Sequence, residues 1–184
     1  ASRCRALAPD LSLSVNISGA SLALPGFAQR LLDLMRRAGL PTGNITLELT
    51  ESAPLPDVDS VKANLHQLHA GGVPVALDDF GSGYSGLAVL AQHPFAEVKI
   101  DHTMVAMMDL PRMRSAIQLA LETARRYDAR FVAEGVETQA QCDTLADMGI
   151  DTGQGYFFSD ALCIEDFLGM LNGRGEARQP LTPV

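Results

Sequence analysis

The stretch VPVALDDFGSGYSGL, residues 73–87, runs from an apolar segment through two adjacent carboxylates into a glycine-rich turn. Side chains alternate between the two faces of a strand with a period of two residues. Along this stretch Val73, Val75 and Leu77 would occupy one face, and Pro74, Ala76 and Asp78 the other. The pattern predicts a strand over 73–79 with one apolar face and one small or polar face, followed by a turn and a helix.

Five other segments have a strand pattern, at residues 11–16, 45–51, 96–101, 130–134 and 151–156. Helical patterns lie between them, at about 27–38, 58–70, 85–92, 113–127 and 139–148. Alternating strands and helices indicate an α/β protein with a parallel sheet. Central strands of an open sheet, covered by helices on both sides, are apolar on both faces. Here one face stays small and polar, so we predict a TIM-type (β/α) barrel whose polar positions point inward.

The active site of such a barrel lies at the carboxyl ends of its strands. Six polar residues fall at or near these ends: Asn16, Glu48, Asp78, Lys99, Glu134 and Gln154. Carboxylate and amide oxygens suit Mg²⁺ or Mn²⁺ better than zinc. Asp78 and Asp79 together can serve two ions, the arrangement used for phosphoester hydrolysis. Lys99 would add a positive charge where phosphate oxygens lie.

Other motifs compete with this interpretation. GSGYSG, residues 81–86, has the G-x-G-x-x-G form of a dinucleotide-binding turn, but Asp78 and Asp79 would then crowd a phosphate. The DFG string lacks the preceding glycine-rich loop and strand lysine of a kinase. His66 and His69 lie three residues apart on a predicted helix, where a partly exposed helix face is the simpler explanation.

The composition of the chain limits the kinds of partner that it can bind. The 184 residues carry a net charge of −8, which argues against binding a nucleic-acid polymer, and no apolar run is long enough to cross a bilayer. Three distant cysteines without a C-x-x-C motif fit a reduced, cytoplasmic setting. We expect one domain over residues 1–172 and a disordered tail over residues 173–184.

Six motifs together resemble the bacterial EAL domain: SVNIS, ELTES, DDFGSGYSGL, VKID, AEGVET and GQGYFF, in this order. The resemblance extends from about Leu11 to Leu171. It implies a modified TIM barrel that linearises cyclic di-GMP to pGpG with two Mg²⁺ or Mn²⁺ ions.

The resemblance also implies roles for individual residues. Metal ligands would be Asn16, Glu48, Asp78 and Glu134, with Asp79 on the second metal. Lys99 would lie near the attacking water and the phosphate, and Gln154 would be a glutamine of the site. Glu137 would be a supporting carboxylate, and Glu51 would steady the loop that follows the aspartate pair. That loop and the helix after it would couple metal binding to formation of a homodimer.

The sequence also departs from the family. The Glu-Ala-Leu motif that names it would lie upstream of Asn16, and six strands are found where a closed barrel needs eight. The stretch FFSDAL lacks the usual proline. We therefore expect an N-terminally incomplete barrel from a longer protein, fused to upstream sensory or GGDEF-type domains, and little activity from this fragment alone. The alternative is an inactive EAL-like module that binds cyclic di-GMP or a partner protein.

Overall fold

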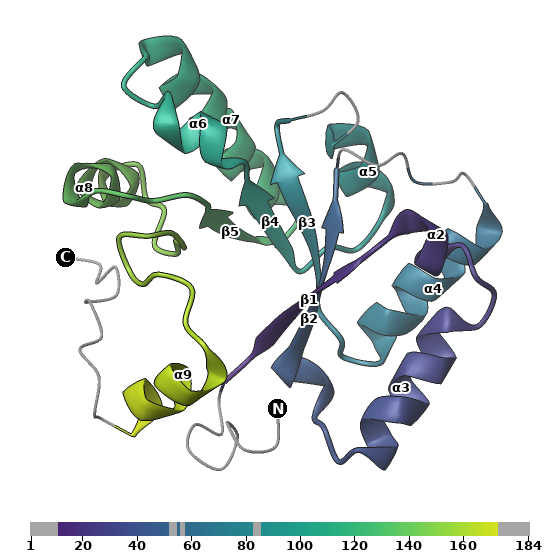
Figure 1. Ribbon diagram of the computed structural model, residues 1–184. Helices are drawn as coiled ribbons and strands as arrows, with labels where there is room; N and C mark the ends of the chain where they lie inside the picture. The colour runs from purple at the N-terminus through teal and green to yellow at the C-terminus, as the bar shows by residue number, and fades with distance from the viewer. Residues whose placement is uncertain (1–10, 52–54, 56–57, 83–85, 173–184) are drawn as a thin grey trace.

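The computed structural model describes residues 11–51, 55, 58–82 and 86–172 (Figure 1). Five parallel strands form one sheet in chain order, so each strand pairs with the next. They are β1 (Leu13–Ile17), β2 (Ile45–Thr50), β3 (Val75–Phe80), β4 (Glu97–Ile100) and β5 (Arg130–Ala133). Each begins and ends within two residues of its predicted position, and the sheet forms part of a TIM-type barrel.

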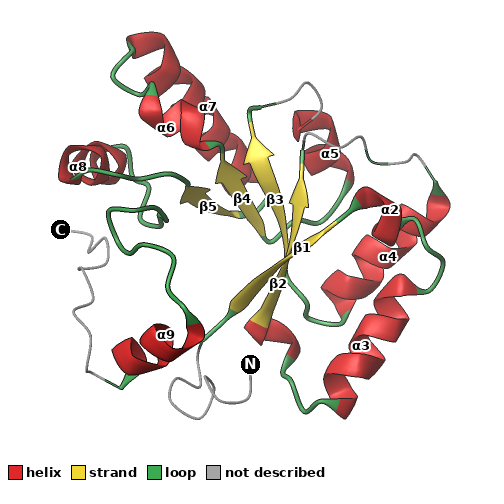
Figure 2. Cartoon of the chain, viewed as in Figure 1, coloured by secondary structure: helices red, strands yellow, loops and turns green. Residues whose placement is uncertain are grey.

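Helices follow the strands and lie outside the curved sheet (Figure 2). They are α2 (Gly19–Leu22), α3 (Phe27–Arg37), α4 (Asp59–Ala70), α5 (Gly86–Gln92), α6 (His102–Ala106), α7 (Pro111–Arg126), α8 (Gln139–Asp147) and α9 (Ile164–Leu171), with a 3₁₀ turn at Thr42–Asn44. None of the helices in the described ranges has the length and apolar character needed to cross a membrane.

The apolar strand positions face the helices. Leu49, Leu77 and Ile100 are at most 1% exposed, and they belong to one core cluster with Leu65 of α4 and Ile117 of α7. Burying each such side chain contributes about 1.5–3 kcal/mol relative to exposure. The predicted sidedness is therefore confirmed for β2, β3 and β4, whereas Val15, predicted on the apolar face of the first strand, is 47% exposed.

The sixth predicted strand, over residues 151–156, is wrong as a strand. Only Gly153 forms a bridge, with Ala133 at the end of β5. Backbone hydrogen bonds from Ala133 N to Thr152 O (3.0 Å) and from Gln154 N to Ala133 O (2.9 Å) still hold the segment beside β5. Two glycines in this segment lower its tendency to extend pairing, because glycine has no side chain to pack and loses more backbone entropy.

Parts of two predictions lie outside the described residues. These are the tail over residues 173–184 and positions 83–85 of the glycine-rich loop. The helix predicted from residue 85 is described from Gly86 onward as α5.

Candidate active site

A bulge in β3 brings both aspartates to the inner face of the sheet. Leu77 pairs with Val98 and Phe80 pairs with Ile100, so two residues of β3 lie opposite one residue of β4, Lys99. Asp79 has a φ of 55°, in the left-handed region that residues other than glycine rarely adopt. Adjacent residues of a regular strand point to opposite faces, and a bulge removes that alternation.

Lys99 lies at the centre of the inner face and is paired with carboxylates from three other strands or strand ends. Its Nζ is 2.8 Å from Glu48 Oε1 and 3.3 Å from Asp78 Oδ1, and it also contacts Glu134 Oε1. The Lys99 side chain is only 4% exposed. Burial lowers the pKa of Lys99, but contacts with Glu134 and Glu48 outweigh it and hold the pKa well above its usual value.

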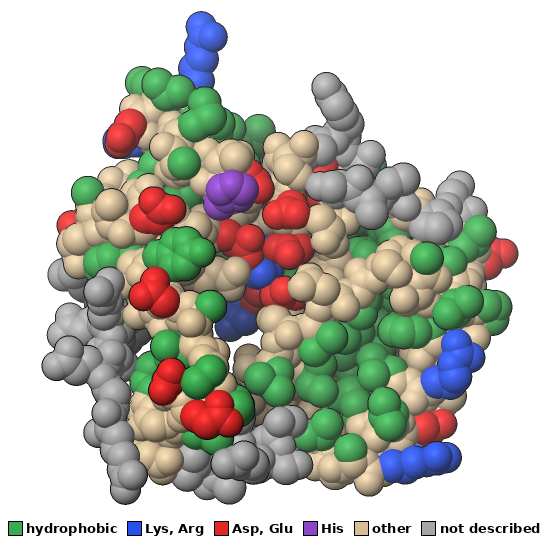
Figure 3. Space-filling model, in the orientation of Figure 1, with side chains coloured by type: hydrophobic (Ala, Val, Ile, Leu, Met, Phe, Trp, Pro, Cys, Tyr) green, Lys and Arg blue, Asp and Glu red, His purple; other side chains and the backbone are tan. Residues whose placement is uncertain are grey.

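The carboxylates outnumber the ammonium group. Asp78, Asp79 and Glu134 each offer an oxygen, and these oxygens lie within 4.8 Å of one another. Asp78 Oδ1 is buried and accepts no hydrogen bond from any described residue, although it lies within ion-pair distance of Lys99. Such an oxygen, in a cluster with excess negative charge, fits a hard divalent cation, which takes oxygen ligands. Figure 3 shows acidic side chains gathered around a basic one on this face.

The pKa values of two of the acids reflect this crowding. Burial raises the pKa of Asp79, and the charges of Asp78 and Asp101 raise it further. Burial also raises the pKa of Glu134, against the opposing effect of its contact with Lys99. Both carboxylates are harder to ionise than usual, mainly because they are partly buried and in part because of neighbouring negative charge, and a cation beside them would favour the charged form.

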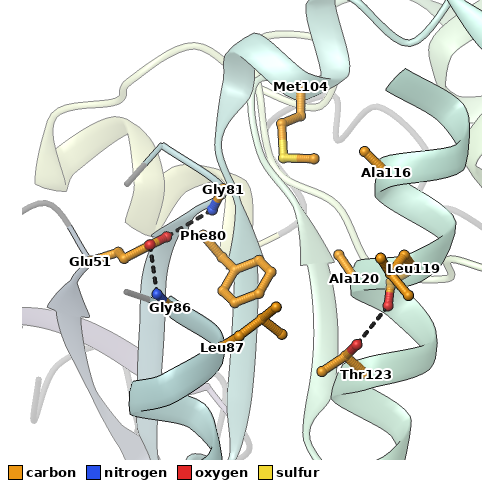
Figure 4. Close-up of a pocket in the computed structure, with 10 residues that line it drawn as sticks. All are labelled: Glu51, Phe80, Gly81, Gly86, Leu87, Met104, Ala116, Leu119, Ala120 and Thr123. Carbon is orange, nitrogen blue, oxygen red and sulfur yellow. Dashed lines mark hydrogen bonds between the residues drawn. The ribbon is translucent and has the colours of Figure 1, made fainter. Parts of the chain in front are cut away.

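Glu51 lies just beyond β2 and holds both ends of the glycine-rich loop. Its Oε2 accepts a hydrogen bond from Gly81 N at 2.8 Å, and its Oε1 accepts one from Gly86 N at 2.7 Å (Figure 4). Gly86 must lack a side chain here, because a Cβ would lie 2.8 Å from the Glu51 carboxyl carbon and from the Phe80 ring. Glu51 therefore links the end of β2 to the segment that follows the aspartate pair.

The remaining predicted residues lie at the margin of the cluster. Gln154 Nε2 donates to Glu134 Oε1 at 2.6 Å. Asn16, on the edge strand β1, is exposed and pairs in register with Glu48. Glu137 is exposed, and lines a cavity of about 360 Å³ together with Glu134 and Gln154.

Two further residues at the site were not singled out from the sequence. Asp101 is 7% exposed, accepts hydrogen bonds from the N–H (2.9 Å) and hydroxyl of Thr103, and so caps α6. Burial raises the pKa of Asp101, but these hydrogen bonds outweigh it and lower the pKa overall. His102 Nδ1 lies 3.2 Å from Asp101 Oδ2. The position of Asp101 at the end of a strand could have indicated it; nothing local distinguishes His102.

Comparison with known proteins agrees with this arrangement. The family model for the EAL domain matches residues 1–161. The cyclic di-GMP phosphodiesterase PdeL of Escherichia coli (strain K12) is 35% identical over 155 residues, which cover 83% of this chain and 43% of PdeL. The curated relatives that the chain matches are longer proteins, and the chain spans between 20% and 43% of their length.

Two solved structures extend the comparison. The EAL domain of Mycobacterium smegmatis DcpA superimposes with a TM-score of 0.86 and 32% identity, over 97% of this chain and 79% of that one. Klebsiella pneumoniae BlrP1, in a complex with manganese and cyclic di-GMP, gives a TM-score of 0.75 and 29% identity, over 85% of this chain and 42% of that one.

Proposed function

Because this chain belongs to the EAL domain family, we propose that it forms part of a phosphodiesterase that hydrolyses cyclic di-GMP to linear pGpG with divalent metal ions. One observation carries the proposal. The oxygens of Asp78, Asp79 and Glu134 lie within 4.8 Å of one another, beside the buried Lys99. A relative of 35% identity is named as a phosphodiesterase of this dinucleotide, which supports the same substrate here.

Two Mg²⁺ or Mn²⁺ ions are the cofactors that suit this cluster. Asp78, Asp79 and Glu134 would hold them, with Glu48 and Asn16 completing the set. When bound, such ions neutralise phosphate charge and make a water molecule acidic enough to attack at neutral pH. The buried Asp78 oxygen without a hydrogen bond supports a ligand at this position.

The protein residues position the reacting groups. Lys99 holds Glu48, Asp78 and Glu134 together and presents a fixed positive charge to a phosphate. Gln154, through its 2.6 Å hydrogen bond, orients the Glu134 carboxylate. Glu48, Asp78 and Lys99 lie on three different strands and Glu134 directly follows a fourth, so the rigid sheet sets most of this geometry.

Glu51 would keep the loop after Asp79 in its working conformation. It accepts hydrogen bonds from both Gly81 and Gly86, and therefore fixes the chain on either side of the intervening positions. Since Gly81 follows Asp79 by two residues, disorder at Gly81 would spread to the left-handed backbone of Asp79. Glu51 is thus a positioning residue in this proposal.

A homodimer through this loop and the following helix is part of the proposal. Leu87 of α5 and Leu119 of α7 are 57% and 61% exposed, and they flank an apolar cavity of about 290 Å³ behind the loop (Figure 4). A second copy that covered these leucines would bury apolar surface. Sedimentation of the wild-type chain and of a Leu87→Glu variant checks this, with a dimer expected only for the wild type.

A receptor without hydrolytic activity is the second candidate. The tripeptide Glu-Ala-Leu, which names the family, does not occur in the 184 residues. In this case the chain would bind cyclic di-GMP, and upstream sensory or GGDEF-type domains in the same protein would use that binding.

A turnover assay separates the two candidates. The purified chain is incubated with cyclic di-GMP and Mg²⁺ or Mn²⁺, and pGpG is followed by chromatography. Slow, metal-dependent formation of pGpG is expected, with none from the Asp78→Asn variant. Binding measured by calorimetry without any pGpG, at all metal concentrations, would favour the receptor.

A further inference from the structure

The turn at the end of β3 begins at Asp79, one of the clustered carboxylates. Ser82 N donates a hydrogen bond to Asp79 O at 3.0 Å, and this bond closes a four-residue turn. Gly81, the third residue of the turn, has a φ of 96°, which glycine adopts without strain. Because the backbone of Asp79 is itself left-handed, the direction of its carboxylate depends on how well the turn is held in place.

Gly81 is held by two contacts. Its N–H donates a hydrogen bond to Glu51 Oε2 at 2.8 Å. The second contact is with Met104 of α6, whose side chain extends toward Gly81 in the apolar cavity behind the loop (Figure 4). A Cβ added to Gly81 would lie 2.5 Å from Met104 Sδ, and the three atoms nearest to it all belong to Met104. The thioether therefore packs directly against the α-carbon of the turn.

Met104 is itself fixed to the sheet. Its side chain is 8% exposed, and its N–H donates to Asp101 O at 3.0 Å at the start of α6. Asp101 directly follows β4, the strand that carries Lys99, and Asp101 N donates to Phe80 O at 3.3 Å. Met104 thus connects the turn after β3 to the end of the neighbouring strand.

We propose that Met104 is a positioning residue for Asp79. Its thioether supports Gly81, and the turn in consequence keeps the backbone conformation that directs the Asp79 carboxylate toward Asp78 and Glu134. The proposal rests on the proposed function, since it takes these three carboxylates as a metal site. It assigns to Met104 a task beyond that of filling the core.

Met108 provides the comparison that separates positioning from packing. It lies one helical turn further along the chain, is 2% exposed and belongs to the same core cluster as Met104. It is not among the described residues that line the cavity shared by Met104 and Gly81. A methionine often fills gaps in a core because it is unbranched and flexible. Removal of either side chain should therefore lower Tm, but only Met104 should affect the turn.

Loss of the thioether should weaken metal binding through Asp79. Changes to groups behind a metal ligand lower metal affinity about 10- to 100-fold, and we expect about 10-fold for Met104→Ala because it acts through the backbone. Met104→Val also lacks the atom that reaches Gly81 but leaves a smaller void, so it serves if the alanine variant does not fold. Met104→Leu keeps a carbon at the δ position and should bind Mn²⁺ within about two-fold of wild type.

Two measurements on the 184-residue chain test the proposal without hydrolysis. Calorimetry gives the affinity for Mn²⁺, and NMR in EDTA gives the exchange rate of the Gly81 amide hydrogen. Met104→Ala and Met104→Val should weaken Mn²⁺ binding and speed exchange at Gly81, whereas Met108→Ala should change neither. In an Asp79→Asn background Met104→Val should weaken Mn²⁺ binding no further, because its effect passes through Asp79.

The outcomes separate this proposal from the phosphodiesterase. The expected pattern in a chain that binds Mn²⁺ but forms no pGpG supports positioning and refutes the phosphodiesterase. Normal pGpG formation, with Mn²⁺ affinity and Gly81 exchange unchanged in Met104→Val, overturns positioning and leaves the phosphodiesterase standing. Equal losses of Mn²⁺ affinity in Met104→Val and Met108→Ala, or a loss that persists in the Asp79→Asn background, would make Met104 a core residue only. A wild-type chain that does not bind Mn²⁺ overturns both proposals.

Discussion

Replacement of Lys99 by methionine should make the stability of the protein depend on divalent cations. In the absence of metal, the Lys99 ammonium group is the positive charge that Glu48, Asp78 and Glu134 contact. Methionine keeps much of the apolar stem and removes the charge. The three carboxylates then repel one another in a buried position until a cation from solution binds them or one of them takes up a proton.

The magnitude follows from the burial of the lysine. Removing one partner of a buried ion pair costs about 3–5 kcal/mol, and the Lys99 side chain is 4% exposed. For a chain of this size each kcal/mol lowers Tm by about 2–4 °C, so a fall of about 6–20 °C is expected in EDTA. A cation at about 100 times its Kd returns about 2.7 kcal/mol.

Thermal denaturation in EDTA and in Mn²⁺ tests this expectation. The Lys99→Met variant should gain more Tm from Mn²⁺ than the wild type does, because no ammonium group competes with the ion for the carboxylates. Turnover of cyclic di-GMP should nevertheless fall. Lys62→Met, on an exposed position of α4, is the control. The reasoning is refuted if the two variants have the same Tm in EDTA, or if Mn²⁺ stabilises Lys99→Met no more than wild type.

Three other substitutions test separate parts of the structure. Asp78→Asn should abolish hydrolysis and weaken Mn²⁺ binding measured by calorimetry, because an amide cannot balance divalent charge; normal turnover would exclude the two-ion site. Glu51→Gln places an NH₂ group against one of the two backbone N–H donors, which costs about 1.5–3 kcal/mol of hydrogen bonding. Turnover should therefore fall, and the affinity for Mn²⁺ should fall less than it does in Glu48→Gln. An equal loss of Mn²⁺ affinity would make Glu51 a ligand instead. Burial lowers the pKa of His93. Its Nδ1 neither accepts a hydrogen bond from a described residue nor donates one to it. The unfolded chain therefore binds a proton more readily, and stability decreases as pH falls through the unfolded pKa of 6.5. His93→Gln should lose less Tm between about pH 7.5 and about pH 5.5 than wild type, and an unchanged slope would contradict the assignment.

The strands, and the sidedness of β2, β3 and β4, were predictable from the sequence because they depend on local periodicity. Five of the six predicted strands are present within two residues, and Leu49, Leu77 and Ile100 are buried as their alternation predicted. The sixth failed because strand pairing is not local. Residues 151–156 have enough apolar character for a strand, but two glycines and a single bridge with Ala133 leave the segment mostly unpaired.

The proximity of Glu48, Asp78, Lys99 and Glu134 was also predictable, since polar side chains at consecutive strand ends must meet when parallel strands align. Alternation alone would send Asp78 and Asp79 to opposite faces of the sheet. The bulge opposite Lys99 and the left-handed backbone of Asp79 bring both aspartates to the same face. Likewise, Glu51 meets Gly81 thirty positions later, and His102 meets Gly135 thirty-three positions later. Contacts at such separations depend on how β2, β3, β4 and β5 pack together, so only the tertiary structure decided them.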